Sequence, residues 1–473
     1  MHNEGFYDEH DIELRTSTTV TAIDSGSSEV AMGGGERLRY DRLLLTTGAA
    51  PRRLSLPGAD LEGVLYLRDL EDAEQIRERI ARGGKVAVIE AGWIGAEVGA
   101  SAREQGLEVA IIERGAVPLE RVLGPELGAV FRDIHRDHGV DLIAGAGLEA
   151  FDGAREVERV LLSDGRAVDC DFVVVGIGVA PRTELAEAAG LTVRDGIVVD
   201  ERLEASVAGI YAAGDVANTP HPLFGRLRVE HWANALNQGP AAARAMLGRE
   251  ERYERIPYFF SDQYDVGLEY SGHADGSRPV VFRGDPASRE FIAFWLDGGR
   301  VAAGMNVNVW EVAETIQALV RSQVVVDPAQ LADESFPLED IGTERPTPAR
   351  PVSGARKLVS QGAQFPKRLL KTRLGKSEAT LVSALGRGEA KILQLDGDKA
   401  AVYRDDEGRL HSVSPVCTHM GCLVDWNDGD RGWDCHCHGS RFDPDGRVLR
   451  GPAKEDLEAR PLTAGDEAAG KPA

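Results

Sequence analysis

Cysteine is scarce in this sequence, with five among 473 residues. Four of the five lie within 21 residues, at Cys417, Cys422, Cys435 and Cys437. A secreted protein held together by disulfides would spread its cysteines along the chain, so this distribution excludes that class. Because histidines stand among these cysteines, the cluster indicates a metal site.

Long apolar runs and positive charge are lacking as well. No run of about 18 apolar residues occurs, and the first residues, MHNEGFYDEHD, are acidic rather than basic and then apolar. We therefore expect no transmembrane segment, signal peptide or transit peptide, and a cytoplasmic location. The net charge of −23 repels phosphate backbones, which excludes nucleic acid as an expected partner.

The remaining composition is that of a soluble globular enzyme, with 42% hydrophobic and 28% charged residues. At about 150 residues per domain, the length predicts roughly three folding units. Alternating positions in residues 1–40 predict short antiparallel strands, and 41–53 predicts a buried strand that ends in a glycine turn. Residues 256–340 mix strands with one amphipathic helix. We expect a helix near 232–247. Further strands are expected at 158–162, 171–179 and 209–215.

A change of composition marks the end of this body. TERPTPARPVSG (343–354) is rich in proline, which stiffens it toward an extended linker. Residues 356–376 then carry seven Lys or Arg and no acid. They form either a solvated face or a segment that docks onto an acidic surface. After residue 377 the chain is rich in strands and short turns, which predicts a small β domain.

The cysteine cluster has a defined spacing. Cys417 and His419 form C-x-H, fifteen residues intervene, and Cys435 and His438 form C-x-x-H. Two thiolates and two imidazoles would also suit a tetrahedral zinc. Each half nevertheless pairs one cysteine with one histidine, which suits a centre where two cysteines hold one iron and two histidines the other. Each half also carries a further cysteine that zinc would not need.

The surrounding segments CTHMGC and CHCHGSRFD closely resemble the Rieske [2Fe–2S] motif, over about the last 90 residues. The resemblance implies the following roles. Cys417 and Cys435 bind one iron and His419 and His438 the other; Cys422 and Cys437 form a disulfide; the Ser440 hydroxyl donates to a bridging sulfide; and GPAKEDL (451–457) covers the cluster. Phe442 stands where respiratory Rieske proteins carry tyrosine. One donor is lost, so we expect a potential below the top of the roughly −150 to +300 mV Rieske range.

Residues 84–114 read as strand, glycine-rich turn, helix and strand, in the register of a dinucleotide-binding βαβ unit. The helix N-terminal N–H groups from Gly92 to Gly95 would meet a pyrophosphate. Glu113 ends the second strand, where it could accept from a ribose hydroxyl and favour NADH over NADPH, although Arg114 follows it. Glu90 occupies the first glycine position of the turn, so we expect weakened nucleotide binding. A structural βαβ unit without a ligand is the alternative.

Several further segments match one family in order: TTGAAPRR (46–53), GIGVAPRTELAEAAGL (176–191), GIYAAGDVA (209–217) and VEHWANALNQG (229–239). Together they resemble the FAD-dependent pyridine nucleotide-disulfide oxidoreductases of the ferredoxin-reductase and apoptosis-inducing-factor group, over residues 5 to about 340. The resemblance implies cofactor contacts at Thr47, Gly48, Arg52, Gly92, Gly95, Glu113, Gly178, Asp215 and Trp232. Within this set Asp215 would bond the FAD ribityl chain, and the helix at Trp232 would point its N-terminus at the flavin.

Two residues are catalytic candidates by the same resemblance: Glu97 near the nicotinamide, and Trp232 beside the flavin. Cys170 is the one cysteine of this body and stands in a strand-like context, where we expect a buried core residue. Dithiol chemistry, which some relatives place next to the flavin, is therefore excluded.

The resemblance implies an α/β FAD/NAD(P)-binding reductase of Rossmann-like (ββα three-layer) fold, a C-terminal α+β domain and an all-β Rieske domain. The sequence begins at what matches the middle of the FAD domain, so we expect an N-terminal truncation that removes the first Rossmann unit. The expected domains are a partial FAD-binding domain (1–83), an NAD(H)-binding domain (84–200), a return segment of the FAD domain (201–255), the C-terminal reductase domain (256–341), a linker (342–376), the Rieske domain (377–465) and a tail (466–473).

The expected function is an oxidoreductase that passes electrons from NAD(P)H through FAD to its own Rieske cluster and on to an unknown acceptor. A flavin is needed because hydride donates two electrons and the cluster accepts one. The alternative is a Rieske electron carrier on a flavin-deficient reductase scaffold. A Rieske oxygenase would need a further iron domain after the cluster, and only 35 residues follow His438. A homodimer is compatible with the sequence.

Overall fold

The computed structural model describes residues 5–342 and, beyond them, 382, 385–395, 398–419, 423–427, 431–435, 439–451, 453–460 and 462. The chain forms two compact units. One is Thr16–Thr343, and the other joins Met1–Arg15 to Glu344–Ala473. Among the described residues, no helix combines the length and apolarity that crossing a bilayer requires.

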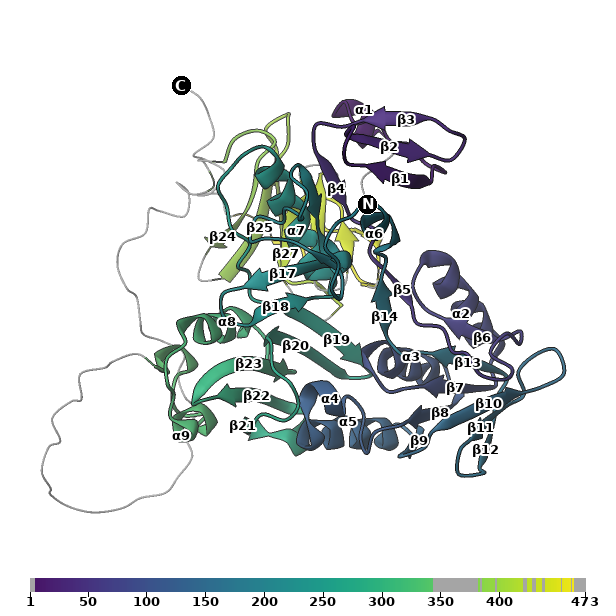
Figure 1. Ribbon diagram of the computed structural model, residues 1–473. Coiled ribbons are helices and arrows are strands. Elements are labelled where there is room, and N and C mark those ends of the chain that lie inside the picture. The colour runs from purple at the N-terminus through teal and green to yellow at the C-terminus, as the bar shows by residue number, and fades with distance from the viewer. Residues whose placement is uncertain are drawn as a thin grey trace, which may run out of the picture. The chain divides into compact units, whose positions relative to one another are not determined.

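A five-stranded parallel sheet carries the dinucleotide-binding sequence. Its order is β6 (Val64–Tyr66), β13 (Phe172–Val175), β7 (Lys85–Ile89), β8 (Glu108–Glu113) and β9 (Asp141–Ala144). Its helices are α2 (Leu70–Arg82), α3 (Trp93–Glu104), α4 (Glu120–Leu123) and α5 (Pro125–Asp137). All of β13 and most of β7 is buried, as expected for parallel strands covered on both faces. The predicted βαβ unit is therefore confirmed as β7, α3 and β8 (Figure 1).

Smaller sheets form the rest of the nucleotide-binding body. They are β1 (Val20–Asp24), β2 (Glu29–Met32) and β3 (Arg37–Arg39); β4 (Leu43–Leu45) with β16 (Ile210–Ala212); and β15 (Ile197–Val198), β17 (Ala217–His221) and β18 (Gly225–Arg228). The helices here are α6 (Glu184–Ala188), the 3-10 turn η1 (Gly214–Val216) and α7 (Trp232–Met246). Their apolar side chains share one core, which includes Ile23, Leu45, Val199, Ile210 and Ala242.

Two further pairings connect and cover these sheets. The antiparallel pair of β5 (Ala49–Pro51) and β14 (Val179–Pro181) joins the segment after β4 to the segment after β13. An antiparallel sheet of β10 (Leu148–Asp152), β11 (Arg159–Leu162) and β12 (Ala167–Asp169) shares a core with the five-stranded sheet.

The start of the chain differs from the predicted pattern in two places. Residues Phe6–Glu9 form the short helix α1 rather than a strand, and the Phe6 carbonyl bonds the His10 ring nitrogen at 2.8 Å. Residues 41–53 form two short strands instead of one. The chain turns between β4 and β5 because Gly48 has a φ of +65°, a conformation that glycine adopts without strain.

Residues 258–342 form a five-stranded antiparallel sheet covered by helices. The strand order is β19 (Tyr258–Gln263), β20 (Val266–Gly272), β23 (Arg300–Val307), β22 (Glu290–Asp297) and β21 (Val280–Asp285). The helices are η2 (Pro286–Ser288), α8 (Ala313–Ser322), α9 (Pro328–Ala332) and η3 (Leu338–Asp340). The predicted amphipathic helix corresponds to α8.

The Rieske-like region forms two antiparallel sheets in its described residues. One contains β24 (Ala390–Leu395), β25 (Asp398–Arg404) and β26 (Leu410–Val413); the other contains β27 (Val424–Asn427), β28 (Gly432–Cys435), β29 (Arg441–Phe442) and β30 (Val448–Arg450). Trp433 and Phe442 are fully buried, and Cys417 and Cys435 belong to the same core. The predicted small β domain is confirmed for these residues.

Candidate functional site

The turn between β7 and α3 has the backbone shape that a dinucleotide needs. Gly92 is the N-cap of α3, and no side chain caps the helix there. At Gly95 an added Cβ would lie 2.1 Å from the carbonyl oxygen of Glu90, so only glycine lets the helix approach the strand this closely. At Gly92 the space is open, with the nearest atom 3.9 Å away. The residues present therefore fit a pyrophosphate at the helix N-terminus.

Glu90 adopts the backbone conformation of the glycine that it replaces. Its φ is +70°, in the left-handed region, where a side chain costs about 1–2 kcal/mol. Its N–H donates to the Ile112 carbonyl at 2.8 Å, which holds the turn against β8. Burial and the neighbouring Glu113 carboxylate raise the pKa of Glu90. The turn thus keeps its shape and gains a carboxyl group that resists ionisation.

Glu113 is buried at the end of β8, and its carboxylate faces the same turn. One oxygen accepts from the N–H of Ala91 at 2.8 Å and the other from the N–H of Gly115 at 2.6 Å. Each carboxylate oxygen keeps a second lone pair. The predicted bond to a ribose hydroxyl therefore remains compatible with the geometry, but a structural role of Glu113 in the turn was missed.

Glu97 lies one turn into α3, and its carboxylate accepts a hydrogen bond from the Ser261 hydroxyl at 2.6 Å. Ser261 belongs to β19, in the C-terminal reductase sheet. Gly178 has a φ of +86° and precedes β14. Its carbonyl accepts from the N–H of Arg52 at 2.9 Å, so the structure brings these two predicted residues together.

Thr47 and Gly48 lie at the same strand crossing. The Thr47 hydroxyl donates to the Arg182 carbonyl at 2.7 Å, and the Arg182 N–H donates to the Gly48 carbonyl at 2.9 Å. Arg52 itself is exposed. The predicted flavin-side residues therefore sit where β5 crosses β14, and their contact with the adenine-diphosphate part of FAD stays a prediction.

Asp215, the predicted contact of the FAD ribityl chain, is held by two arginines. Its carboxylate accepts from the Arg68 guanidinium at 2.8 Å, and its carbonyl accepts from Arg228 at 3.2 Å. The Asp215 side chain is largely buried beside its arginine partner. Arg68 was missed by the sequence analysis, because nothing in its own segment marks an arginine before α2 as a partner of Asp215.

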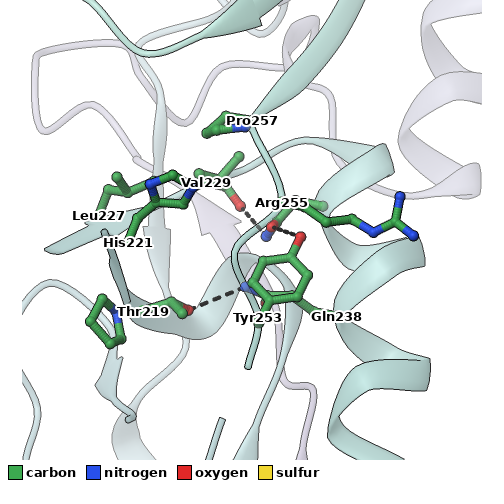
Figure 2. Close-up of a pocket in the computed structure, with 10 residues that line it drawn as sticks. Thr219, His221, Leu227, Val229, Gln238, Tyr253, Arg255 and Pro257 are labelled. Atoms are coloured by element: carbon green, nitrogen blue, oxygen red, sulfur yellow. Dashed lines mark hydrogen bonds between the residues drawn. The ribbon is translucent and has the colours of Figure 1, made fainter. Parts of the chain in front are cut away.

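Helix α7 is held in place by a buried polar network. Gln238 accepts from the Gly214 N–H at 2.8 Å and donates to the Thr219 hydroxyl at 3.2 Å. Tyr253 donates to Asn234 at 3.0 Å across the small pocket that Figure 2 shows beside the helix. These bonds fix α7 against the turn that carries Asp215, so the two predicted flavin contacts keep a constant separation.

The first turn of α7 presents Trp232, whose side chain is half exposed. His231, the N-cap residue, stacks on Phe259 with ring centroids 4.3 Å apart. Burial lowers the pKa of His231 to about 4. This histidine is therefore neutral at physiological pH. It adds no charge to the positive end of the α7 helix dipole.

Cys170 is a buried core residue, as predicted. Burial raises the pKa of its thiol to about 12. A thiol with so high a pKa is a poor nucleophile. The absence of dithiol chemistry at Cys170 stays a prediction, which its burial and raised pKa support.

In the Rieske-like region the structure brings Cys417 and Cys435 together. Both are buried in one core with Val424. Val424 pairs with Cys435 across the sheet, and its N–H donates to the Pro415 carbonyl. His419 is half-buried two residues beyond Cys417. The predicted ligand His438 and the predicted disulfide residues Cys422 and Cys437 lie outside the described residues.

The described residues contain no group of three metal-ligating side chains. Ser440 is fully buried, and its oxygen accepts from the Ala453 N–H at 2.9 Å. That bond leaves the hydroxyl proton for another acceptor, so the donor set fits a cluster sulfide.

The predicted covering loop is tied to both ligand loops. Ala453 donates to Ser440 on one side, and the Thr418 hydroxyl donates to the Glu455 carbonyl at 2.5 Å on the other. Thr418 stands between Cys417 and His419. Its bond to Glu455 therefore ties residues 451–457 to the segment that carries these two predicted ligands. The covering role of residues 451–457 stays a prediction that these contacts support.

A second polar cluster lies on β26. His411 Nδ1 bonds Asp445 at 2.7 Å, and its Nε2 lies 3.3 Å from Asp405. Burial alone would lower the pKa of His411, but the two aspartates outweigh burial and raise it. Burial also acts to raise the pKa of Asp405, yet hydrogen bonds from Arg409 and His411 hold it at about 2. His411 therefore joins β26 to the turn between β29 and β30, and the two aspartates favour its protonated form.

We expect the stabilising effect of His411 to depend on pH. A histidine with a raised pKa in the folded state contributes fully below its ordinary value of about 6.5, and the contribution is lost as pH rises through the raised pKa. His411→Gln should therefore lower the unfolding free energy by on the order of 1 kcal/mol in mild acid and by less in alkali. Thermal unfolding followed by cluster absorbance measures this, with Asp445→Asn as the matched variant. An equal loss of unfolding free energy at every pH would show that the contribution of His411 does not depend on its protonation.

Comparison with known proteins identifies the family. Residues 4–239 match the family described as pyridine nucleotide-disulphide oxidoreductase, residues 258–342 match a reductase C-terminal family, and residues 377–461 match the Rieske [2Fe-2S] domain. Putidaredoxin reductase CamA from Pseudomonas putida is 37% identical over 342 residues, which cover 71% of this chain and 81% of the relative. The chain belongs to the pyridine nucleotide-disulphide oxidoreductase family.

Two further likenesses agree with this assignment. The ferredoxin–NAD(+) reductase component of an anthranilate 1,2-dioxygenase system from Burkholderia cepacia is 37% identical to this chain. The match covers 72% of this chain and 84% of the relative. The solved covalent putidaredoxin reductase–putidaredoxin complex matches with a TM-score of 0.69 and 36% identity, covering 72% of this chain and 83% of that chain.

The sequence predictions of family, fold class, enzyme class and cofactors are confirmed. The reductase is an oxidoreductase that transfers electrons from NAD(P)H through FAD, and its C-terminal region is a Rieske [2Fe–2S] domain. NADH as the donor and a ferredoxin-type acceptor fit the relatives.

Proposed function

We propose that the reductase passes electrons from NADH through FAD to the Rieske cluster of the same chain, and from this cluster to an acceptor outside it. The observation that carries the proposal is the presence, on one chain, of a nucleotide site and a buried Cys417–Cys435 core with Ser440 ready to donate. Bound FAD would convert a two-electron hydride donor into the one-electron steps that a [2Fe–2S] cluster accepts.

The residues of the chain have the following proposed roles. The N–H groups at Gly92 to Gly95 bind the NADH pyrophosphate, Glu113 accepts from the adenosine ribose, and Glu97 lies at the nicotinamide. Asp215, held by Arg68, binds the flavin ribityl chain, and Trp232 lies beside the flavin ring with Thr47, Gly48, Arg52 and Gly178 along the remainder. Cys417, His419, Cys435 and His438 hold the cluster, and Cys422 and Cys437 form a disulfide.

Several finer points belong to the same proposal. The buried Glu113 carboxylate beside the turn would repel a 2′-phosphate, which supports NADH over NADPH. We also propose that the domains have the borders expected from the sequence. The proposed location is cytoplasmic, and the proposed oligomer is a homodimer. Fusion of cluster and reductase makes the last internal transfer independent of diffusion, since linkage raises effective concentration.

Anaerobic mixing of NADH with the full chain, supplied with FAD, tests the proposal. Cluster absorbance should bleach at a rate that does not change with protein concentration. Each chain has one cluster that accepts one electron, so the second electron of the hydride should stay on the flavin of the same chain until an acceptor takes it. A chain that binds FAD and NADH but keeps its cluster oxidised would contradict the internal transfer. A cluster that responds only to an added reductase, in a chain that takes up no FAD, would instead favour the carrier function.

A further inference from the structure

A serine of the C-terminal reductase sheet contacts the predicted nicotinamide residue. Ser261 on β19 is almost completely buried, and its hydroxyl donates to Glu97 Oε1 at 2.6 Å. Glu97 lies on α3 and is half-buried. A hydroxyl bond of this length to a carboxylate is a charge-assisted bond, roughly twice as strong as a neutral one. The two residues are 164 positions apart in the sequence.

A second buried side chain fixes the direction of this bond. Gln263 lies on the same buried face of β19, and its Nε2 donates to the Ser261 oxygen at 3.3 Å. A serine hydroxyl has one proton and its oxygen has two lone pairs. Because Gln263 donates to the oxygen, the Ser261 proton is directed to the Glu97 carboxylate.

The polar chain continues to α5. His135 is fully buried, and its Nδ1 bonds the Tyr264 hydroxyl at 2.9 Å. Burial lowers the pKa of His135, although a side-chain hydrogen bond with Gln263 acts to raise that pKa. Gln263 therefore lies between Ser261 and His135, and its position helps to fix that of Ser261.

We propose that Ser261 is a positioning residue, which holds the Glu97 carboxylate in the orientation that meets the nicotinamide carboxamide of NADH. The inference rests on the proposed role of Glu97 in the NADH site. The C-terminal reductase domain then contributes to nucleotide recognition through β19, although the nucleotide itself binds on the β7–α3 turn.

A second buried serine in the same sheet provides a matched control. Ser271 on β20 is as completely buried as Ser261, and it too accepts from a glutamine, Gln317, at 3.3 Å. Its partner lies on α8, away from Glu97. Loss of either hydroxyl should therefore disturb the sheet to a similar extent, whereas only Ser261 directs a proton to the nucleotide site.

The test compares Ser261→Ala, Ser261→Thr and Ser271→Ala in the full chain by calorimetry with NAD+ and with ADP-ribose, which lacks the nicotinamide. We expect Ser261→Ala to weaken NAD+ binding roughly tenfold, since the bond to a charged group is lost. ADP-ribose binding should stay within twofold of the unsubstituted chain. Ser261→Thr should restore NAD+ binding, and Ser271→Ala should leave both ligands unaffected.

Two outcomes would overturn the inference: equal NAD+ affinity in Ser261→Ala and the unsubstituted chain, or an equal loss for NAD+ and ADP-ribose. These binding measurements need no electron transfer. A chain that binds NAD+ with the expected pattern but fails to reduce its cluster would therefore refute the proposed function and leave the role of Ser261 standing.

Discussion

Glu90→Gly is expected to tighten NADH binding by up to roughly thirtyfold, the equivalent of ~2 kcal/mol at a partly buried helix terminus. The glutamate backbone already has the glycine-like φ of +70°, so the substitution keeps the turn and removes its strain. It also removes a carboxyl group from the N-terminus of α3, where the pyrophosphate needs the N–H groups and the positive end of the dipole.

The pH dependence of this effect separates charge from shape. Burial and Glu113 raise the pKa of Glu90, so its carboxyl group becomes neutral at a higher pH than an ordinary glutamate, whose value is about 4.5. As pH falls through the raised pKa, the repulsion of phosphate is lost, and the affinity difference between the Glu90→Gly variant and the unsubstituted chain should narrow. Raising the ionic strength should narrow it too.

Calorimetry of NADH binding to the full chain measures both trends. Glu90→Gln is the matched control, because it keeps the side chain and the strained backbone but removes the charge. Glu90→Gln should recover the part of the gain in NADH affinity that comes from removing the charge. Its NADH affinity should show no pH dependence from residue 90. Equal affinities for the unsubstituted chain and Glu90→Gly would mean that the carboxyl group points away from the bound phosphates.

Cys435→Ser is expected to abolish the Rieske cluster. Cys435 is buried beside Cys417 at the end of β28, and a serine hydroxyl is a poor substitute for a thiolate ligand to iron. We expect iron and acid-labile sulfide to fall to background, and the visible bands of the cluster to disappear. Cluster content that matches the unsubstituted chain would show that Cys435 is not a ligand.

The control is Cys170→Ser, because Cys170 is a buried cysteine of the reductase body with no predicted ligand role. It should keep the full cluster content. In the Cys435→Ser variant, NADH oxidation by a dye that accepts electrons directly from the flavin should continue at an unchanged rate. Loss of that activity as well would mean that the cluster region supports the fold of the reductase body.

Local sequence patterns determined much of this protein. Four ligand positions with fixed spacing, and a glycine-rich turn between a buried strand and a helix, predicted the Rieske domain and the βαβ unit that the structure and the relatives confirm. These patterns are readable because hydrogen-bond periodicity and ligand spacing act over a few residues. The unusual Glu90 was visible for the same reason, as one wrong residue in a short motif.

Tertiary structure alone decided which distant side chains contact the residues of the proposed nucleotide sites. Arg68 meets Asp215 across 147 positions, and Ser261 meets Glu97 across 164. Neither arginine nor serine stands in a recognisable motif, since the pairing depends on how β19 and the segment before α2 pack against the nucleotide-binding sheets. A contact between sequence-distant residues leaves no periodic trace in either segment, so only the folded chain brings its two members together.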